Sequence, residues 1–476
     1  MGGQTSRCAI DNAVALDPDR RPSALTRTTA LIAKYGGRVP RYTSYPTAAQ
    51  FTPAVAEDDH RTWLAALDPR SAASLYLHIP FCDRLCWYCG CHTAVVHQRG
   101  PVADYVRTLV REIEIIGQAL PENPRASALH FGGGTPNMIA PDDLRAIVGA
   151  LRERFTFTIP FEFAVELDPR ILTSEWVDAA ADLGLSRASL GVQDLNAQVQ
   201  RAINRLQPYA QIEWAVTRLR QAGIGSINLD LMYGLPHQSV ATIVATLDQV
   251  LALSPERIAL FGYAHVPWMK AHQRLLPEAS LPDAVERFDQ QIAAAERLGK
   301  AGYVRIGLDH FARQEDELAK AGRNGLLRRN FQGYTSDRAA SLLGFGASSI
   351  SAMPQGYAQN AARVPEWRQR VNAGRLATAR GLVVGPDDRV RGEIIERLMC
   401  DMRVDVAGVC AAHHRSPSQF AAELLRLAEM EADGLVKRAG ARIEVTGDGR
   451  PFVRTIAAVF DAQSRSNETG RHAPSI

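Results

Sequence analysis

Cysteine is concentrated in one short stretch of this chain. Four of its seven cysteines lie within ten residues, at Cys82, Cys86, Cys89 and Cys91. A hydrophobic core does not require such a density, because a buried cysteine packs like any small apolar side chain. Clustered thiolates instead bind zinc or iron–sulfur clusters. Structural zinc sites usually take a second cysteine pair after a longer loop, and no such pair follows here.

The spacing C-x3-C-x2-C favours an iron–sulfur cluster. We expect Cys82, Cys86 and Cys89 to be three ligands of a [4Fe-4S] cluster, which leaves one iron without a protein ligand. An open coordination position is typical of a catalytic metal rather than a structural one. A single glycine separates Cys91 from Cys89, so both could reach one cluster only by straining the loop. Cys91 is therefore not expected to be a ligand. A zinc knuckle is the alternative interpretation.

Short apolar runs alternate with longer amphipathic segments on either side of the cysteine loop. Six runs predict strands, at residues 74–80, 126–131, 161–167, 187–192, 226–232 and 257–263. The segments between them repeat apolar residues at helical spacing. Six strand–helix units in series predict an α/β fold with a parallel sheet and right-handed crossovers. Eight units close a full barrel, so six predict a partial barrel. An open doubly wound sheet is the alternative.

Polar and glycine residues follow these predicted strands, where a barrel places its chemistry. The second strand is followed by Gly132-Gly133-Gly134-Thr135, and three glycines let a ligand approach the backbone. The third strand ends in Glu166 and Asp168, which are costly to bury unless they are partnered. Gln193 and Asp230 end the fourth and fifth strands. We expect these side chains to meet the cysteine loop at one end of the barrel.

Composition excludes several classes of protein. A hydrophobic content of 46% with 22% charged residues is ordinary for a globular chain, and 476 residues suit a large domain plus a smaller one. The net charge of +3 gives no indication of nucleic-acid binding. No apolar run approaches the ~20 residues of a membrane helix. Reactive cysteines indicate a reducing compartment, so we expect a cytoplasmic location.

The cysteine motif resembles that of the radical S-adenosylmethionine (SAM) superfamily, because an aromatic residue, Tyr88, directly precedes the third cysteine. The longer string from Tyr76 to Cys91 resembles a narrower group, the oxygen-independent coproporphyrinogen III oxidases. Two further strings resemble the same family, PRYTSYPT at residues 40–47 and NFQGYT at residues 330–335.

This resemblance implies a partial (β/α)6 barrel of the radical SAM type with a smaller, mostly helical C-terminal domain. We expect a mobile N-terminal tail over residues 1–38, with one helix near residues 26–35. Residues 39–362 would form the catalytic domain. Residues 363–476 would form a winged-like cap, with short strands at residues 435–438, 441–445 and 452–455.

The resemblance also implies one [4Fe-4S] cluster and two SAM molecules, and no catalytic side chain beyond these groups. The positions that match contacts of the cluster-bound SAM are Tyr76, Gly133, Glu166 and Ile350. The positions that match contacts of the second SAM are Tyr88, Gly134, Thr135, Gln193, Arg205, Asp230 and Ala264.

The implied reaction converts two propionates of coproporphyrinogen III into vinyl groups and gives protoporphyrinogen IX, by a 5′-deoxyadenosyl radical formed from SAM. A reductase or flavodoxin-type protein would donate the electron, an unknown acceptor would take the remaining one, and the protein would be a monomer. The substrate has four carboxylates, so arginine forks are needed near the site. The candidates are Arg41, Arg305, Arg328 and Arg329.

Two other functions are weighed against this one. A non-catalytic relative that binds and delivers haem shares the three-cysteine loop and GGGTP, but it typically lacks a residue at Cys91 and the NFQGY string. This chain has both features, which favours the oxidase. A zinc-organised interaction module would be colourless, whereas an iron–sulfur protein is brown.

Overall fold

The computed structural model describes residues 24–463, and its centre is a twelve-stranded sheet. Six parallel strands lie side by side in chain order in the middle of this sheet. They are β1 (Ala73–Ile79), β4 (Arg125–Gly133), β5 (Thr156–Leu167), β6 (Arg187–Gln193), β7 (Ser226–Tyr233) and β8 (Arg257–Gly262). All six predicted strands are confirmed. An order without a reversal excludes the doubly wound alternative, because that fold reverses its strand order at a switch point.

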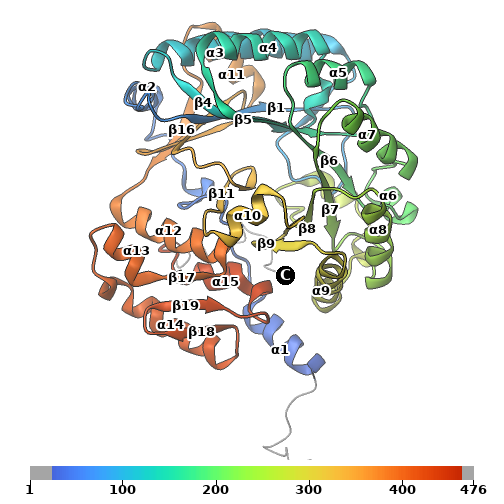
Figure 1. The fold of residues 1–476 in the computed structure, drawn as a ribbon, viewed down its shortest axis with the longest axis vertical. Coiled ribbons are helices and arrows are strands. Elements are labelled where there is room, and N and C mark those ends of the chain that lie inside the picture. The colour runs from blue at the N-terminus through green and yellow to red at the C-terminus, as the bar shows by residue number, and fades with distance from the viewer. Residues whose placement is uncertain (1–23, 464–476) are drawn as a thin grey trace, which may run out of the picture.

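Helices connect these strands and cover the outer face of the sheet (Figure 1). They are α3 (Arg99–Ala119), α4 (Pro141–Arg154), α5 (Ser174–Asp182), α6 (Ala197–Ala202), α7 (Tyr209–Gln221), α8 (Val240–Ala252) and α9 (Ala284–Lys300). Local sequence fixes several of their starts. The hydroxyl oxygens of Thr173 and Ser239 accept hydrogen bonds from backbone N–H groups in the first turns of α5 and α8. Asp283 caps α9 in the same way.

The sheet extends beyond the predicted strands at both edges. On the β1 side it adds β13 (Ser341–Phe345), parallel to β1, and then β14 (Ile350–Met353), β15 (Gly356–Asn360) and β16 (Thr378–Val383), which are antiparallel. On the β8 side it adds β10 (His310–Ala312) and β9 (Val304–Ile306). Because the first and last of the twelve strands do not pair, the sheet is an incomplete barrel.

The two largest hydrophobic cores among the described residues divide the chain. The larger lies between the sheet and its helices, and it includes Trp367 and Val371 of α11 (Val364–Asn372). The second is built from α12 (Pro386–Asp401), α13 (Val406–Ala412), α14 (Ala421–Ala432) and α15 (Val453–Ala458). Because α11 belongs to the larger core, we place the domain boundary between β16 and α12, after the predicted position of residue 363.

A small antiparallel sheet completes the C-terminal domain. Its strands are β17 (Arg403–Asp405), β19 (Arg442–Val445) and β18 (Val436–Ala439), in that spatial order. Two of the three predicted strands are confirmed. The third, at residues 452–455, is wrong: this stretch is the 3-10 turn η6 (Arg450–Phe452) and the start of α15, whose Val453 and Ile456 share one buried face. No helix that the structure describes is long and apolar enough to cross a membrane.

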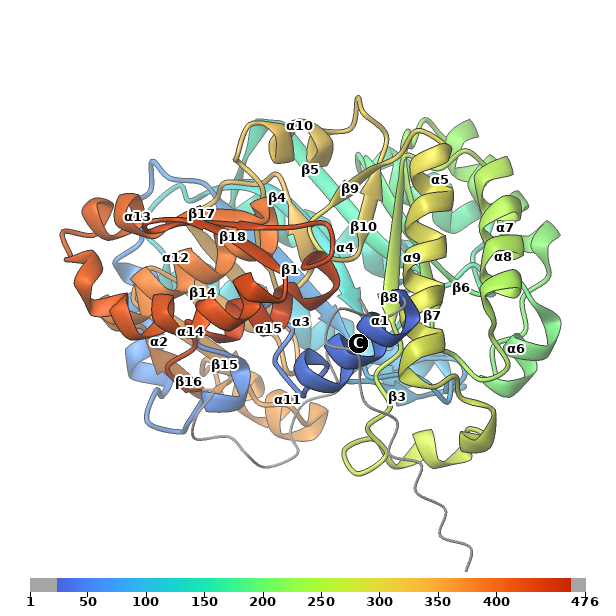
Figure 2. The same cartoon turned by 90° about the horizontal axis from the view of Figure 1, so that it is seen from below.

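The N-terminal segment packs onto the C-terminal domain. Helix α1 (Ala24–Tyr35) confirms the predicted helix and lies beside α9 (Figure 2). Tyr35, Tyr42 and Tyr45 are buried in the second core, and the hydroxyl of Tyr42 donates a hydrogen bond to Asp461 over 2.9 Å. The prediction of a mobile tail is at odds with these contacts from residue 24 onward. Residues 1–23 of that tail lie outside the described residues.

Candidate active site

The cysteine loop leaves the carboxyl end of β1 and packs against neighbouring loops at the same end of the barrel. Its first residues form β2 (Phe81–Cys82), which pairs with β3 (Ala94–Val95). The backbone N–H of Trp87 donates to the carbonyl of Ile203 over 3.0 Å, and Gly134 N–H donates to Ile79 over 2.8 Å. These bonds fix the loop to the segments that follow β4 and α6.

One cavity of about 480 Å³, which we call the cysteine cavity, opens at this end of the barrel. The three predicted cluster ligands line it, and so do most residues predicted to contact SAM. The predicted residues in its lining are Cys82, Cys86, Cys89, Tyr88, Gly133, Gly134, Thr135, Glu166, Gln193, Arg205, Asp230 and Ala264. The structure therefore brings together residues from loops spread over more than a third of the chain.

Tyr76 and Ile350 are not in the lining of this cavity. Tyr76 lies on β1, where its ring stacks on His130 with 5.9 Å between centroids. Glu166, which does line the cavity, lies next to Tyr76, because a Cβ placed on Gly132 would lie 3.0–3.1 Å from both side chains. Ile350 begins β14, beyond Gly344, the β13 residue that pairs with Tyr76. Tyr76 therefore adjoins the cavity through Glu166, whereas Ile350 lies farther along the sheet, on the β14 side of β1.

The glycines after β4 bring backbone close to the cysteine loop. A Cβ on Gly134 would lie 2.4 Å from Thr93 Oγ1 and 2.6 Å from the carbonyl oxygen of Phe81. Gly133 has a φ of 120°, which only glycine adopts readily. Any side chain at Gly134 would push β2 and the cysteine loop away, so the sequence GGG is explained by this close approach.

Each thiol has its own polar partners. The hydroxyl of Thr135 donates to Cys82 Sγ over 3.3 Å, and Thr93 Oγ1 lies 3.1 Å from the same sulfur. Burial raises the pKa of Cys82. Hydrogen bonding from Cys91 lowers the pKa of Cys89, which favours its thiolate. The backbone N–H of Cys91 contributes one of these bonds, over 3.4 Å.

Two arginines face the thiol of Cys86. Arg205 donates to its Sγ over 3.4 Å, and Arg170 donates over 3.7 Å. Asp168 holds both guanidinium groups, at 2.6 Å from Arg170 and 3.4 Å from Arg205. Burial disfavours the charge of Arg205, but the neighbouring Tyr88, Asp168 and Cys86 outweigh that effect and raise its pKa. Asp168 thus has the partners that a buried carboxylate requires.

Two carboxyl groups on neighbouring strands face the cavity in different environments. Burial disfavours the charge of Glu166, but a hydrogen bond with His130 over 3.3 Å outweighs it and lowers the pKa of Glu166. Burial, and then the charge of Glu166, raise the pKa of Asp230 to about 6. Ser189 and Asn228 donate hydrogen bonds to Asp230 over 2.8 and 2.7 Å. An ionised Glu166 is suited to a ligand ammonium or hydroxyl group.

A loop after β8 covers the outer side of the cysteine loop, and sequence reasoning missed it. Gln273 donates to the carbonyl of Tyr88 over 2.9 Å, and Lys270 donates to that of Cys91 over 2.9 Å. His272 Nε2 lies 2.7 Å from the carbonyl oxygen of Cys89. No sequence pattern marks these residues, because side chains that bond to backbone carbonyls have no characteristic spacing.

The donor set of the cysteine cavity fits an iron–sulfur cluster. Three thiols open on one cavity, and guanidinium and hydroxyl groups bond to their sulfurs, which suits the negative charge of a thiolate-bound cluster. Within residues 24–463, no three His, Cys, Asp or Glu side chains converge as ligands of a single metal ion.

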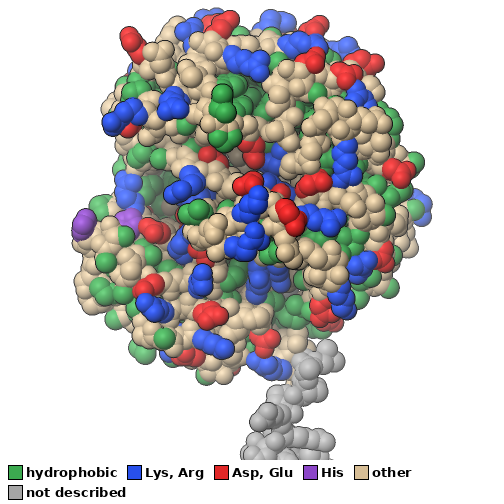
Figure 3. Space-filling view, viewed as in Figure 1, with side chains coloured by type: hydrophobic (Ala, Val, Ile, Leu, Met, Phe, Trp, Pro, Cys, Tyr) green, Lys and Arg blue, Asp and Glu red, His purple; other side chains and the backbone are tan. Residues whose placement is uncertain are grey.

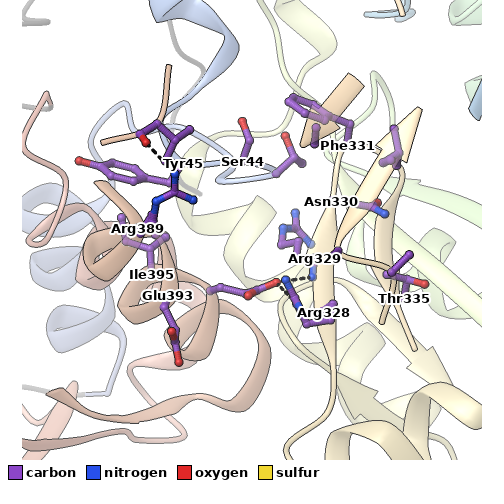
Figure 4. A pocket seen from close by; sticks show the side chains of 18 of the residues that line it. Ser44, Tyr45, Arg328, Arg329, Asn330, Phe331, Thr335, Arg389, Glu393 and Ile395 are labelled. Carbon is purple, nitrogen blue, oxygen red and sulfur yellow. Dashed lines mark hydrogen bonds and ion pairs between the residues drawn. The ribbon is translucent and has the colours of Figure 1, made fainter. Parts of the chain in front are cut away.

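The four arginines predicted to bind substrate carboxylates divide between two places. Arg41 lines the cysteine cavity. Arg328 and Arg329 line a second cavity of about 670 Å³, which we call the interdomain cleft, between the barrel and α12 (Figure 4). Arg328 forms an ion pair with Glu396 over 2.9 Å, which neutralises it. Arg305 lies on β9 and lines neither cavity.

Comparison with known proteins places these features in context. The family model of the Radical SAM superfamily matches residues 76–250. The chain is 47% identical to an oxygen-independent coproporphyrinogen III oxidase of Bradyrhizobium diazoefficiens, over 91% of this chain and 96% of the relative. It is 44% identical to the enzyme of that name from Paracoccus denitrificans, over 90% and 94% of the two chains.

A solved structure is similar over nearly the same range. The chain resembles the structure of coproporphyrinogen III oxidase from Escherichia coli, described as a radical SAM enzyme. The TM-score is 0.86 at 38% sequence identity, over 91% of this chain and 98% of that one. The similarity extends over the barrel and the C-terminal domain together.

Proposed function

The chain belongs to the oxygen-independent coproporphyrinogen III oxidases of the radical SAM superfamily, and we propose that it oxidatively decarboxylates two propionates of coproporphyrinogen III to vinyl groups. The product would be protoporphyrinogen IX, an intermediate of haem biosynthesis. The observation that carries this proposal is the meeting of three thiols, the glycine turn and two carboxyl groups in one cavity at the carboxyl end of the barrel. The relatives described above are all oxidases, so the alternative of a haem carrier finds no support among them.

Membership of the superfamily implies a [4Fe-4S] cluster and SAM as cofactors. We assign the cluster to Cys82, Cys86 and Cys89. We assign the cluster-bound SAM to Tyr76, Gly133, Glu166 and Ile350, and a second SAM to Tyr88, Gly134, Thr135, Gln193, Arg205, Asp230 and Ala264. When bound, the cluster and SAM together supply a carbon-centred radical that removes a hydrogen atom from a substrate propionate.

The protein's own groups position these molecules and exclude water. The bonds from Thr135 and Arg205 to sulfur orient the thiols, as outer-shell partners do for metal ligands. Glu166 offers an anion to a ligand ammonium group, and the backbone at Gly133 allows close approach. The loop that bears Gln273 and Lys270 closes the outer side of the cysteine loop. The chain thus supplies binding and orientation, while the cofactor supplies the difficult chemistry.

The reaction also requires electron transfer partners. We propose a reductase or flavodoxin-type donor that docks at the end of the barrel where the cysteine loop lies. A separate acceptor takes the electron released when carbon dioxide leaves, and the protein acts as a monomer. Light scattering on the reconstituted protein tests the last point.

The activity is tested by anaerobic incubation of the reconstituted protein with SAM, a reductant and coproporphyrinogen III. We expect methionine, 5′-deoxyadenosine and protoporphyrinogen IX, with two vinyl groups formed for each substrate molecule. Haem binding without vinyl formation would favour the carrier. A colourless protein that contains zinc and does not cleave SAM would reject the oxidase.

A further inference from the structure

Five arginines from distant parts of the chain gather between the cysteine cavity and the interdomain cleft. We call them the arginine cluster: Arg41 before the barrel, Arg287 on α9, Arg305 on β9, Arg329 on β11 (Arg328–Asn330), and Arg450 in the C-terminal domain. They lie within electrostatic range of one another or of shared neighbours such as Tyr233 and Asp309. Arginine and lysine side chains are visible in the hollow between the two domains (Figure 3).

The arginine cluster carries more positive than negative charge. Among residues 24–463, Asp309 is the single carboxylate within ion-pair distance of any of the five guanidinium groups, at 4.0 Å from Arg329. Their other hydrogen bonds go to backbone carbonyls, which are neutral. Arg41 donates to Gly262, and Arg287 donates to Tyr263. The buried guanidinium group of Arg454 lies within electrostatic range of Arg41, Arg329 and Asp309 as well. Positive charge therefore exceeds negative charge in this region.

Arg41 is exposed, but burial makes the positive charge of the other four arginines costly. Only 5% of the Arg329 side chain is exposed, and its Nε and Nη1 have no hydrogen-bond partner. The Nε atoms of Arg287 and Arg305 also have none. Burial lowers the pKa of Arg287 and Arg305, and burial with the nearby Arg305 lowers the pKa of Arg450 to about 9. Buried charges are normally paired, so this cluster lacks its counter-ions.

The arginine cluster is reached from both cavities. Arg41 lines the cysteine cavity and Arg329 lines the interdomain cleft, while Nη2 of Arg329 donates to the carbonyl of Arg41 over 3.4 Å. The cleft has aromatic walls, with Phe331 and Tyr357 edge to face at 6.0 Å between centroids. Figure 4 shows Arg329 and Phe331 on one side of the cleft, opposite Tyr45 and Arg389. A cleft of about 670 Å³ is in the range that holds a large flat ligand.

We propose that the arginine cluster binds the carboxylates of a tetracarboxylate tetrapyrrole, through Arg41 and Arg329, and so discriminates substrate from product. The identity of this ligand rests on the proposed function. The four ionised propionates of such a ligand would supply negative charge to this positively charged region. The reaction removes two of these carboxylates, so the product loses half of that compensation. The same cluster that retains the substrate therefore favours release of the product.

The test compares two porphyrins as probes. Coproporphyrin III has four carboxylates, and deuteroporphyrin IX has two. The full-length, anaerobically reconstituted protein is titrated with each, and binding is followed by porphyrin fluorescence. We expect the tetracarboxylate to bind at least ~10-fold more tightly, because each added hydrogen bond to a charged group contributes enough for about that factor. Equal affinity for the two porphyrins, or binding of neither, would overturn the proposal.

Variants on one strand give a matched comparison. Arg329→Gln should lower the preference for coproporphyrin III by ~10-fold, whereas Arg328→Gln should leave it unchanged, because Glu396 already neutralises Arg328. A purely structural role predicts that Arg329→Gln weakens the ligand-free protein. A role in ligand binding predicts unfolding at the same or a higher urea concentration. Retention of the preference in both Arg329→Gln and Arg41→Gln would overturn the proposal.

Vinyl formation is measured on the same preparations. The oxidase activity and the role of the arginine cluster can therefore be rejected independently of each other. Product formation without any preference for the tetracarboxylate leaves the oxidase activity standing and rejects the arginine cluster as the carboxylate site. A carboxylate preference that depends on Arg329, without vinyl formation, supports the cluster and rejects the activity.

Discussion

Nη1 of Arg205 lies 3.4 Å from Sγ of Cys86 and, on its other side, 3.4 Å from Oδ2 of Asp168. One buried guanidinium group thus connects a predicted cluster ligand to the carboxylate that directly follows β5. Arg170 pairs with the same carboxylate, so Asp168 keeps a partner when Arg205 is replaced. This arrangement allows the effect of Arg205 on the thiol to be tested apart from its effect on Asp168.

We predict that Arg205→Gln lowers the reduction potential of the bound cluster and costs ~10–100-fold in activity, the usual effect of losing an outer-shell partner. A positive charge beside a ligand sulfur stabilises the more negative, reduced cluster. The potential is measured by redox titration followed by electron paramagnetic resonance. Arg218→Gln, which removes an arginine paired with Asp178 on the outer helices, is the control. Equal potentials in the two variants would contradict this assignment.

The cysteines are expected to differ in their contribution to iron binding. Cys89→Ala should lose the cluster and lower SAM cleavage by more than the ~10–100-fold typical of outer-shell changes. Cys91→Ala should retain iron, because Cys91 is assigned as a hydrogen-bond partner of Cys89 rather than a ligand. Iron and sulfide are measured after anaerobic reconstitution. If Cys89→Ala bound a normal amount of iron and Cys91→Ala bound none, Cys91 would be the cluster ligand and Cys89 its hydrogen-bond partner.

Gly134→Ala is expected to disturb the cysteine loop. Its Cβ would lie 2.6 Å from the carbonyl oxygen of Phe81 and 2.9 Å from the Phe81 nitrogen, so backbone must move, at ~1–3 kcal/mol. Iron content after reconstitution should fall, and the urea midpoint should decrease. Gly149→Ala, in α4, has open space around its Cβ and should stabilise by ~1 kcal/mol. Similar behaviour of the two variants would show that the close approach is unimportant.

Asp230 predicts a dependence of stability on pH. Its pKa is raised from 3.8 to about 6 in the folded protein, so the folded state holds this proton more tightly than the unfolded state does. The stability that this group contributes is complete below about pH 4 and is lost as the pH rises through 6. Asp230→Asn removes the charge and should stabilise the SAM-free protein by ~1–3 kcal/mol at pH 8.

The same substitution should have little effect at pH 4, where Asp230 is already neutral. Urea unfolding of both proteins at the two pH values measures the difference. Asp230→Asn should also weaken SAM binding at pH 8, since a ligand hydroxyl or ammonium group loses its anionic partner. An unchanged difference in unfolding free energy between the two pH values would show that folding does not raise the pKa of Asp230.

Much of the barrel could be predicted from sequence, because its strands are continuous apolar runs bounded by clear helix starts. The cysteine loop and the glycine turn could also be predicted, because the residues of each motif are close together in the sequence. The strands β13 to β16 were missed, since they are short and contain glycine and polar residues such as Gly344 and Gln359. Their pairing is decided by the neighbouring strand rather than by their own pattern.

The arginine cluster shows where sequence reasoning ends. Arg41 and Arg450 are more than four hundred residues apart, and neither lies in a spacing that marks a site. Arg328 and Arg329 are adjacent and were equivalent candidates, yet Glu396 pairs with the first, and the second has unpaired nitrogens. Only the folded arrangement of the two domains separates them.

The placement of Tyr35, Tyr42 and Tyr45 has a consequence for biosynthesis. The ribosome makes these residues early, yet the core that receives them is assembled from Val390 onward. The hydroxyl of Thr455 donates to the carbonyl of Tyr35 over 2.8 Å, so α15 is hydrogen-bonded to the end of α1. The buried residues of the larger core end at Ala377, so the barrel can fold before the second core is synthesised. During translation these tyrosines stay unpacked until the C-terminal domain has been synthesised. The N-terminal segment can therefore dock only at the end of synthesis.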